Sequence, residues 1–201
     1  MGDTAERQTT AARPQAADSS GGAEVARSRR IRLRQLCFAD IPWLSRLYAP
    51  NELQHLQLDE SPTRFFEVAA LVASAHQIYE KHRGLGVWRA DAIDGEFIGI
   101  FSLTPRDATG EMEIRARLAP EAWGHWYAIE GGRLLCRYAF VALGLPALAA
   151  YCHPGHEVVA HILTRIGFCD TGLCDYDGKT ARRFELEAAR WSAAQATLRA
   201  Y

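Results

Sequence analysis

The chain has 201 residues, which is enough for one domain with a sizeable hydrophobic core, and its 48% hydrophobic and 23% charged residues are ordinary for a soluble globule. A formal net charge of −1 indicates neither a nucleic-acid nor a membrane surface. The five cysteines have no disulfide-framework spacing, and we find neither a secretory leader nor an apolar run of membrane length. We therefore expect a cytoplasmic protein, monomeric or homodimeric, without nucleic-acid or membrane partners.

The chain begins with a segment that has almost no large apolar side chains. Residues 1–28 are rich in Ala, Gly, Ser, Thr, Gln and charged residues, so they cannot bury enough surface to offset the entropy lost on ordering. We predict a disordered tail over residues 1–28 and a folded domain over residues 29–187. The alanine-rich residues 188–201 are expected to form a C-terminal helical tail.

The first part of the predicted domain contains one strand and two helices. Residues 31–36 alternate polar and apolar side chains, as a half-buried strand does, and Asp40 stands where the N-cap of a first helix is expected. A polar connection over 51–60 follows. The pair Ser61-Pro62 favours a helix start, and Gly84 ends that second helix.

The rest of the domain alternates strands with two further helices. Asp94-Gly95 is a strong hairpin signal between two strands. The expected later elements are strands at 86–93, 96–103, 111–118 and 147–152, helices from 127 to Gly144 and at 157–165, and a hairpin of strands at 168–174 and 180–187. The resulting order, β-α-α-β-β-β-α-β-α-β-β, predicts an α+β fold.

The turn between the strand at 111–118 and the following helix is a candidate anion site. A turn that leads into a helix N-terminus directs free backbone N–H groups and the positive end of the helix dipole at one place, which suits phosphate. An ordinary strand-to-helix connection would explain the single glycine, Gly124, equally well.

Three stretches carry a resemblance to a known family: LAPEAWGHWYAIE, YAFVALGLPALAAYCHP and LTRIGF. Together they resemble the acetyl-coenzyme A signature of the GNAT N-acetyltransferases, most of all the branch that acetylates ribosomal-protein N-termini and small amines. The resemblance covers about residues 31–186. It implies a single GNAT-type domain with a central mixed, mostly antiparallel sheet flanked by helices, and acetyl transfer from acetyl-CoA, a co-substrate, to a primary amine. That amine would belong to a protein N-terminus or to a small molecule.

The resemblance also implies where the coenzyme lies. The strand backbone would meet the pantetheine arm and the thioester at Ala116, Arg117 and Leu118. The turn would hold the pyrophosphate through backbone N–H groups at Trp123, Gly124, His125, Trp126, Tyr127 and Ala128.

Acetyl transfer needs a base, because a lysine-like amine is protonated at pH 7. The family often carries a carboxylate on this strand, so Glu113 is the candidate base, acting through water; a solvated strand glutamate is the alternative. His156 is a candidate acid or base, and Glu130 is better explained by the helix dipole than by catalysis. The connection that lines the acceptor site in relatives makes His55, Asp59 and Glu60 candidate acceptor contacts, although the polarity of a loop would explain them equally well. Arg115 is a further candidate: Arg115 and Arg117 could attract a phosphate or an acidic group of the substrate, or form only a charged outward face.

Three positions depart from the family pattern. Trp126 replaces a glycine, while His156 and Val159 replace an Asn and a Ser that contact the coenzyme in relatives. A catalytically degenerate GNAT-fold binding protein that does not use acetyl-CoA is therefore the alternative function. The spacing of His153, His156 and His161 matches no standard zinc site, so we expect no metal.

Overall fold

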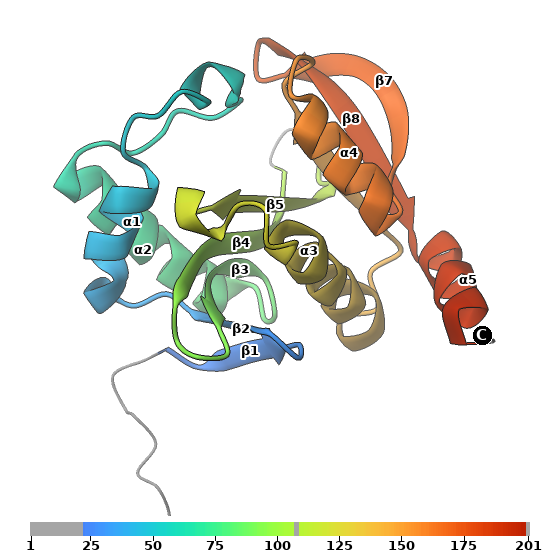
Figure 1. Cartoon of the computed structure of the whole chain (residues 1–201), viewed down its shortest axis with the longest axis horizontal. Helices are drawn as coiled ribbons and strands as arrows, with labels where there is room; N and C mark the ends of the chain where they lie inside the picture. The colour runs from blue at the N-terminus through green and yellow to red at the C-terminus, as the bar shows by residue number, and fades with distance from the viewer. Residues whose placement is uncertain (1–21, 107–108, 200–201) are drawn as a thin grey trace, which may run out of the picture.

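A computed structural model describes residues 22–106 and 109–199 of the chain. Its centre is an eight-stranded sheet in the order β1-β2-β3-β4-β5-β6-β8-β7 (Figure 1). Every neighbouring pair is antiparallel except β5 and β6, which confirms the predicted mixed, mostly antiparallel sheet. The strands are β1 (Glu24–Arg27), β2 (Ile31–Gln35), β3 (Gly86–Ala92), β4 (Phe97–Pro105), β5 (Met112–Leu118), β6 (Ala147–Cys152), β7 (Cys169–Tyr176) and β8 (Lys179–Glu187).

Helices cover both faces of the sheet and make the fold α+β, as predicted (Figure 1). They are α1 (Ile41–Leu47), α2 (Phe65–Lys81), α3 (Tyr127–Arg137), α4 (Glu157–Ile166) and α5 (Ala188–Arg199), with short 3-10 turns η1 (Phe38–Asp40), η2 (Gln54–Leu56) and η3 (Pro120–Ala122) and a π-helical turn η4 (Tyr138–Ala142) that prolongs α3. None of the helices in the described ranges is long and apolar enough to cross a membrane.

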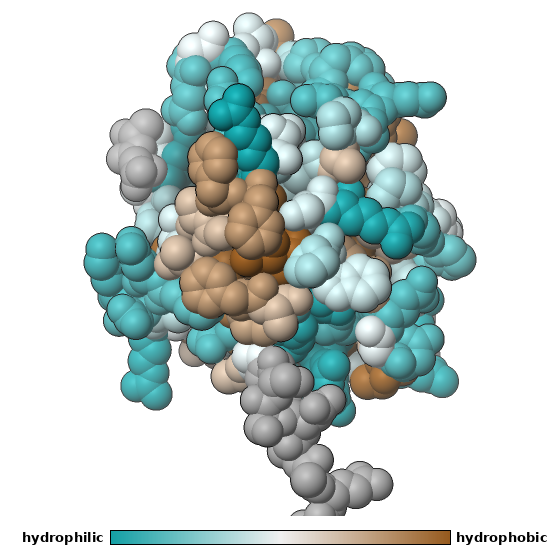
Figure 2. Space-filling model, turned by 90° about the vertical axis from the view of Figure 1, so that its left-hand side faces the viewer, coloured by the Kyte–Doolittle hydropathy of each residue, from teal (hydrophilic) through white to brown (hydrophobic). Residues whose placement is uncertain are grey.

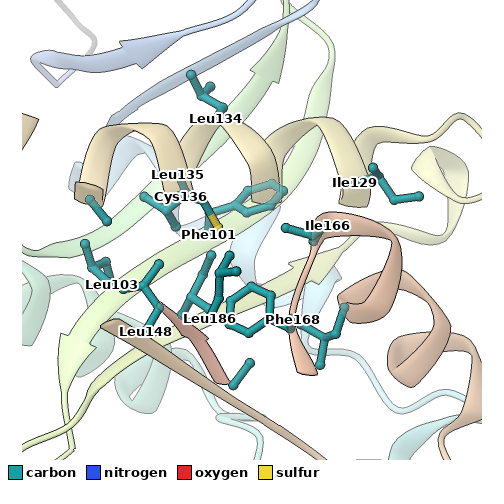
Figure 3. Packing of buried hydrophobic residues seen from close by; sticks show 14 of the residues in the cluster. Phe101, Leu103, Ile129, Leu134, Leu135, Cys136, Leu148, Ile166, Phe168 and Leu186 are labelled. Atoms are coloured by element: carbon teal, nitrogen blue, oxygen red, sulfur yellow. The ribbon is translucent and has the colours of Figure 1, made fainter. Parts of the chain in front are cut away.

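Two separate hydrophobic clusters show which helix packs on which face. Helices α3 and α4 share one cluster with Phe101 and Leu103 of β4 (Figure 3). Helices α1 and α2 pack instead with Phe97 and Ile100 of the same strand. Because side chains of a strand alternate between its two faces, Ile100 points away from the Phe101 face, and the α1–α2 pair lies on the opposite side of the sheet from α3. A register shift in the pairing with β3 brings Phe97 to the Ile100 face. The surface of the α1–α2 side is partly apolar (Figure 2). The exposed large apolar side chains of η1, α1 and α2 include Phe38, Trp43, Phe65 and Phe66.

Helix α3 approaches the sheet very closely. A Cβ at Gly131 would overlap the buried ring of Phe101, so only glycine allows this distance. Leu135 and Cys136 of the same helix are buried in the same cluster (Figure 3). The close contact fixes the N-terminus of α3 relative to β5.

The structure places a strand where composition predicted only a tail. β1 pairs antiparallel with β2, so the assignment of residues 22–28 to a disordered segment is wrong; residues 1–21 lie outside the described residues. An edge strand is stabilised largely by backbone hydrogen bonds, which composition does not reveal. Val25 and Ala26 pack against the main core, and Ser28 Oγ donates a hydrogen bond of 2.6 Å to a carboxylate oxygen of Glu130.

The second helix begins about one turn later than Ser61-Pro62 predicts. Arg64 is the N-cap of α2, and the carboxylate of Glu67 accepts hydrogen bonds from the backbone N–H groups of Thr63 and Arg64 at 2.8 and 3.0 Å. This capping interaction, rather than the proline, sets the start. At the other end of the chain, Trp191 is 6% exposed and its ring lies 6.0 Å from that of Phe140, which docks α5.

The β1 strand yields a stability prediction. A chain beginning at Arg29 loses the β1–β2 pairing and the bond from Ser28 to Glu130, whereas a chain beginning at Gly22 keeps both. We expect the shorter chain to melt at least about 4 °C below the longer one, which corresponds to roughly 1–2 kcal/mol for a domain of this size. Calorimetry on the two chains checks this, and equal melting temperatures would show that β1 contributes nothing.

Candidate active site

The sheet opens between β5 and β6. β5 is paired with β4 along its whole length, from Met112 to Leu118, but it pairs with β6 only where Glu113 lies opposite Ala149. Beyond Glu113 the two parallel strands separate, and the β6-facing backbone edge of β5 has no ladder partner in β6. Backbone groups need hydrogen-bond partners, so this edge suits an extended ligand beside Ala116, Arg117 and Leu118.

The N-terminus of α3 lies directly after this strand. Trp126 is the N-cap, its φ of 65° and ψ of 8° are left-handed, and no side chain caps the helix. The first hydrogen bond of the helix runs from Glu130 N to Trp126 O at 3.1 Å, so the N–H groups of Tyr127 and Ala128 precede the intrahelical ladder. The turn therefore has the donors and the dipole that an anion requires.

The side chain of Trp126 lies beside α4. Its indole is 60% exposed, and its ring centroid is 5.1 Å from the guanidinium carbon of Arg165 near the end of α4. At the neighbouring Gly124, whose φ is +79°, nothing lies within 4 Å of the position that a Cβ would occupy. There is thus open space along the turn next to Gly124.

Glu130 holds the turn rather than facing the opening. Its carboxylate accepts a hydrogen bond from Arg30 Nε at 2.7 Å, in addition to the bond from Ser28. Arg30 Nη2 also donates to His125 O at 3.0 Å. Burial opposes ionisation, but the hydrogen bonds from Ser28 and Arg30 outweigh it and lower the pKa of Glu130. The observed contacts are those of an anchor for the first turn of α3.

Glu113 is buried at the apex of the β5–β6 opening. The residue is 3% exposed, and Tyr176 Oη lies 3.1 and 3.2 Å from its two carboxylate oxygens; Arg115 Nε is 3.6 Å away. Burial raises the pKa of Glu113 above its ordinary value, against the opposing effects of Arg115 and Tyr176. The interpretation of Glu113 as a solvated strand glutamate is therefore wrong.

Tyr176 is a site residue that the sequence did not reveal. The sequence predicts a hairpin turn between the strands at 168–174 and 180–187, whereas Tyr176 ends β7 and is buried against Glu113. The guanidinium carbon of Arg106 lies 4.2 Å from the centroid of the Tyr176 ring and 5.2 Å from that of the Tyr151 ring. A cation–π contact with Arg106 therefore helps to hold the Tyr176 ring in place. Only packing between distant strands brings these groups together.

The connection between α1 and α2 lies over the same face of β5. Arg115 Nη1 donates to the Asp59 carboxylate, and Arg117 donates to Ser61 Oγ at 2.9 Å and to Gln57 Oε1 at 2.6 Å. The predicted acceptor residue Asp59 is thus joined to β5. His55 and Glu60 are exposed in the same connection, and a ring nitrogen of His55 bonds Glu52 O.

His156 is the N-cap of α4, the helix that follows β6 on the β6–β8 side of the opening. Burial lowers the pKa of His156, and the charges of His153 and His55 lower it further, so the imidazole is neutral at pH 7. Within the described residues no hydrogen bond joins His156 to Glu113, and no group of three or more potential ligands could hold a metal ion.

A family model described as an acetyltransferase (GNAT) domain matches residues 30–169. The chain belongs to the GNAT acetyltransferase family. A curated relative, the FsC-acetyl coenzyme A-N(2)-transacetylase of Aspergillus fumigatus, is 40% identical over an alignment of 70 residues that covers 31% of this chain. The match spans only 29% of the length of that relative.

Solved structures show the same fold at low sequence identity. A Vibrio cholerae protein assigned as a ribosomal-protein-serine acetyltransferase superposes with a TM-score of 0.69 at 15% identity, covering 82% of this chain and 97% of that one. Spermidine N-acetyltransferase from Vibrio cholerae, in complex with CoA and spermine, superposes with a TM-score of 0.68 at 16% identity, covering 82% and 99%.

The contact between Tyr176 and Glu113 yields a prediction about titration. The hydrogen bond from Tyr176 lowers the pKa of Glu113, so Tyr176→Phe should raise that pKa further. Tyr151→Phe is the matched control, because the hydroxyl of Tyr151 bonds Glu111 instead. Carboxyl-detected NMR of the two variants measures the change, and an equal effect of both substitutions would contradict the assignment.

Proposed function

We propose that this protein transfers an acetyl group from acetyl-CoA to a primary amine, with Glu113 as the general base. The observation that carries the proposal is the buried carboxylate of Glu113 at the apex of the β5–β6 opening. Membership of the GNAT family supports the coenzyme, and the open N-terminus of α3 supports a phosphate site beside that opening.

The residues of the chain would divide the binding of the coenzyme between two sites. The turn from Trp123 to Ala128 would hold the pyrophosphate through backbone N–H groups and the dipole of α3. The β6-facing edge of β5 at residues 116–118 would hold the pantetheine arm by backbone hydrogen bonds, as in a strand addition. One group of this edge, Leu118 O, already accepts a bond from Trp123 Nε1 at 3.1 Å. When bound, acetyl-CoA supplies an acyl group already activated as a thioester.

Glu113 would make the amine nucleophilic. The carboxylate takes a proton from the ammonium group through a water molecule, because Glu113 itself is almost fully buried. The neutral amine then forms the new C–N bond to the acetyl carbon, and backbone N–H groups of β5 stabilise the oxyanion. The C–S bond breaks and the thiolate leaves. The nitrogen loses two protons in all: the first passes from Glu113 through water to the solvent, and the second, lost as the amide forms, protonates the thiolate.

A binding protein without enzymatic activity is the second candidate, and one observation favours it. Val159, at a position where relatives have a serine, lies in the first turn of α4 and has no side-chain donor for the coenzyme. Acetyl-CoA affinity separates the two functions directly, independently of any acceptor.

The first test addresses the base. Glu113→Gln removes the proton acceptor but keeps the size of the side chain, so turnover should fall by about 10²-fold or more with little change in coenzyme affinity. Because burial raises the pKa of Glu113, the acidic limb of the wild-type kcat/KM profile should lie above the ordinary glutamate range and rise as the carboxylate loses its proton. Wild-type turnover in the variant from pH 6 to 9 would move the base elsewhere.

The second test addresses the altered turn. The indole of Trp126 packs toward Arg165, so Trp126→Gly should change acetyl-CoA affinity less than tenfold, which is under about 1.4 kcal/mol. Titration calorimetry of wild type and variant measures this, with micromolar binding expected for both. Binding that occurs only in the glycine variant would favour the protein without enzymatic activity.

A further inference from the structure

One face of β5 places three charged side chains beneath the connection between α1 and α2 (residues 51–60), which we call the acceptor side. Glu113, Arg115 and Arg117 alternate along the strand and therefore share a face. Arg117 stands opposite Ile100 of β4, and Ile100 packs with α1 and α2. This face is consequently turned away from α3, whose N-terminus is the candidate phosphate site. An anion bound by these side chains would come with the acceptor and not with the coenzyme phosphates.

The two arginines differ in their partners. Arg115 is paired with the Asp59 carboxylate and lies near that of Glu113. Burial opposes ionisation of Arg115, but the charges of Glu113 and Asp59 outweigh it and raise its pKa. The positive charge of Arg115 is thus already balanced by the protein.

Arg117 has only uncharged partners among the described residues. Its guanidinium donates to Ser61 Oγ and Gln57 Oε1 and lies 4.4 Å above the ring centroid of Tyr48, and no ion pair within the described ranges includes it. These bonds use two of the five N–H donors of an arginine. Burial and the charge of Arg115 lower the pKa of Arg117, and the opposing charge of Asp59, which forms no ion pair with Arg117, does not reverse the shift.

A second cation near this face also lacks a carboxylate. Lys179 begins β8, and its ammonium group donates to the backbone oxygen of Leu58, in the connection that carries Asp59. Like Arg117, it takes part in no ion pair among the described residues. Arg117 and Lys179 are therefore two cations on this side of the sheet that form no ion pair with a carboxylate of the described residues.

We propose that the acceptor is a small amine that carries a carboxylate, which the guanidinium of Arg117 binds while the amine lies near Glu113. This rests on the acetyl transfer proposed above. A guanidinium has the planar fork that matches a carboxylate, and Tyr48 and Gln57 hold this one in place. Glu113 and Arg117 are four residues apart, about 13 Å along a strand, so the amine and the carboxylate belong at opposite ends of an extended molecule.

The test compares acceptors that differ only in the carboxylate. The pairs are lysine against cadaverine and 6-aminohexanoate against hexylamine, each assayed with acetyl-CoA for kcat/KM. Wild type should prefer the carboxylated member at least tenfold, and Arg117→Gln should abolish the preference mainly through KM. Arg46→Gln is the control and should keep the preference, because Arg46 lies on α1 and forms an exposed ion pair with Glu121. Arg117→Lys keeps the positive charge but lacks the planar guanidinium, so it should retain part of the preference for the carboxylated acceptor.

Equal use of both members by wild type, or a preference that survives in Arg117→Gln, overturns the proposal. If Arg117 has a purely structural role, Arg117→Gln lowers kcat/KM equally for both members of a pair, and this result also overturns the proposal. Thermal melting of each variant confirms that it is folded.

A binding experiment separates this proposal from the proposed function. Saturation-transfer NMR with coenzyme A in place of acetyl-CoA allows no turnover; lysine and 6-aminohexanoate should bind at millimolar concentration, and cadaverine and hexylamine should not. Loss of this selectivity in Arg117→Gln, with coenzyme A affinity unchanged, supports the carboxylate site even if no acetylation is detected. Acetylation of all four compounds without selectivity supports acetyl transfer but contradicts the carboxylate site. Failure of all four compounds to bind also contradicts the carboxylate site.

Discussion

The separation of β5 from β6 is the constraint on which the candidate site depends. β5 is held along its whole length by β4, but by β6 only at Glu113. An unpaired backbone edge inside a sheet is costly unless a ligand or water satisfies it. The fold tolerates it because α3 is anchored independently, through the close contact at Gly131 and the cluster around Phe101.

One strand thereby serves two purposes. Its backbone edge faces the opening, while its side chains face the α1–α2 connection and the acceptor side. At the apex, Glu113 is buried between the hydroxyl of Tyr176 and the guanidinium of Arg115, and burial raises its pKa. A carboxylate with a raised pKa is a better proton acceptor near neutral pH than an exposed one.

The turn before α3 shows how a bulky residue occupies a position where the resemblance leads one to expect glycine. Trp126 adopts a left-handed conformation, which costs a residue with a Cβ roughly 1–2 kcal/mol. Contacts around the turn offset this cost: Arg165 packs on the indole, and Arg30 joins His125 to Glu130. The departure from the glycine pattern is therefore accommodated by neighbouring arginines that lie far away in sequence.

The sequence by itself determined the order of the elements from β2 onward, because alternation, helical spacing and Asp94-Gly95 are local signals. It did not reveal β1, whose place depends on backbone pairing with β2. The motif around Gly124 pointed to the family, and the position of Glu113 on a strand was also predictable. Tertiary structure alone decided that Glu113 is buried, because Tyr176 and Arg115 approach it only in the folded sheet. It also decided the difference between Arg115 and Arg117, which are equivalent in strand pattern. Arg115 donates to the carboxylate of Asp59, whereas Arg117 donates to the uncharged Ser61 and Gln57. These pairings depend on contacts between segments more than fifty residues apart in the sequence.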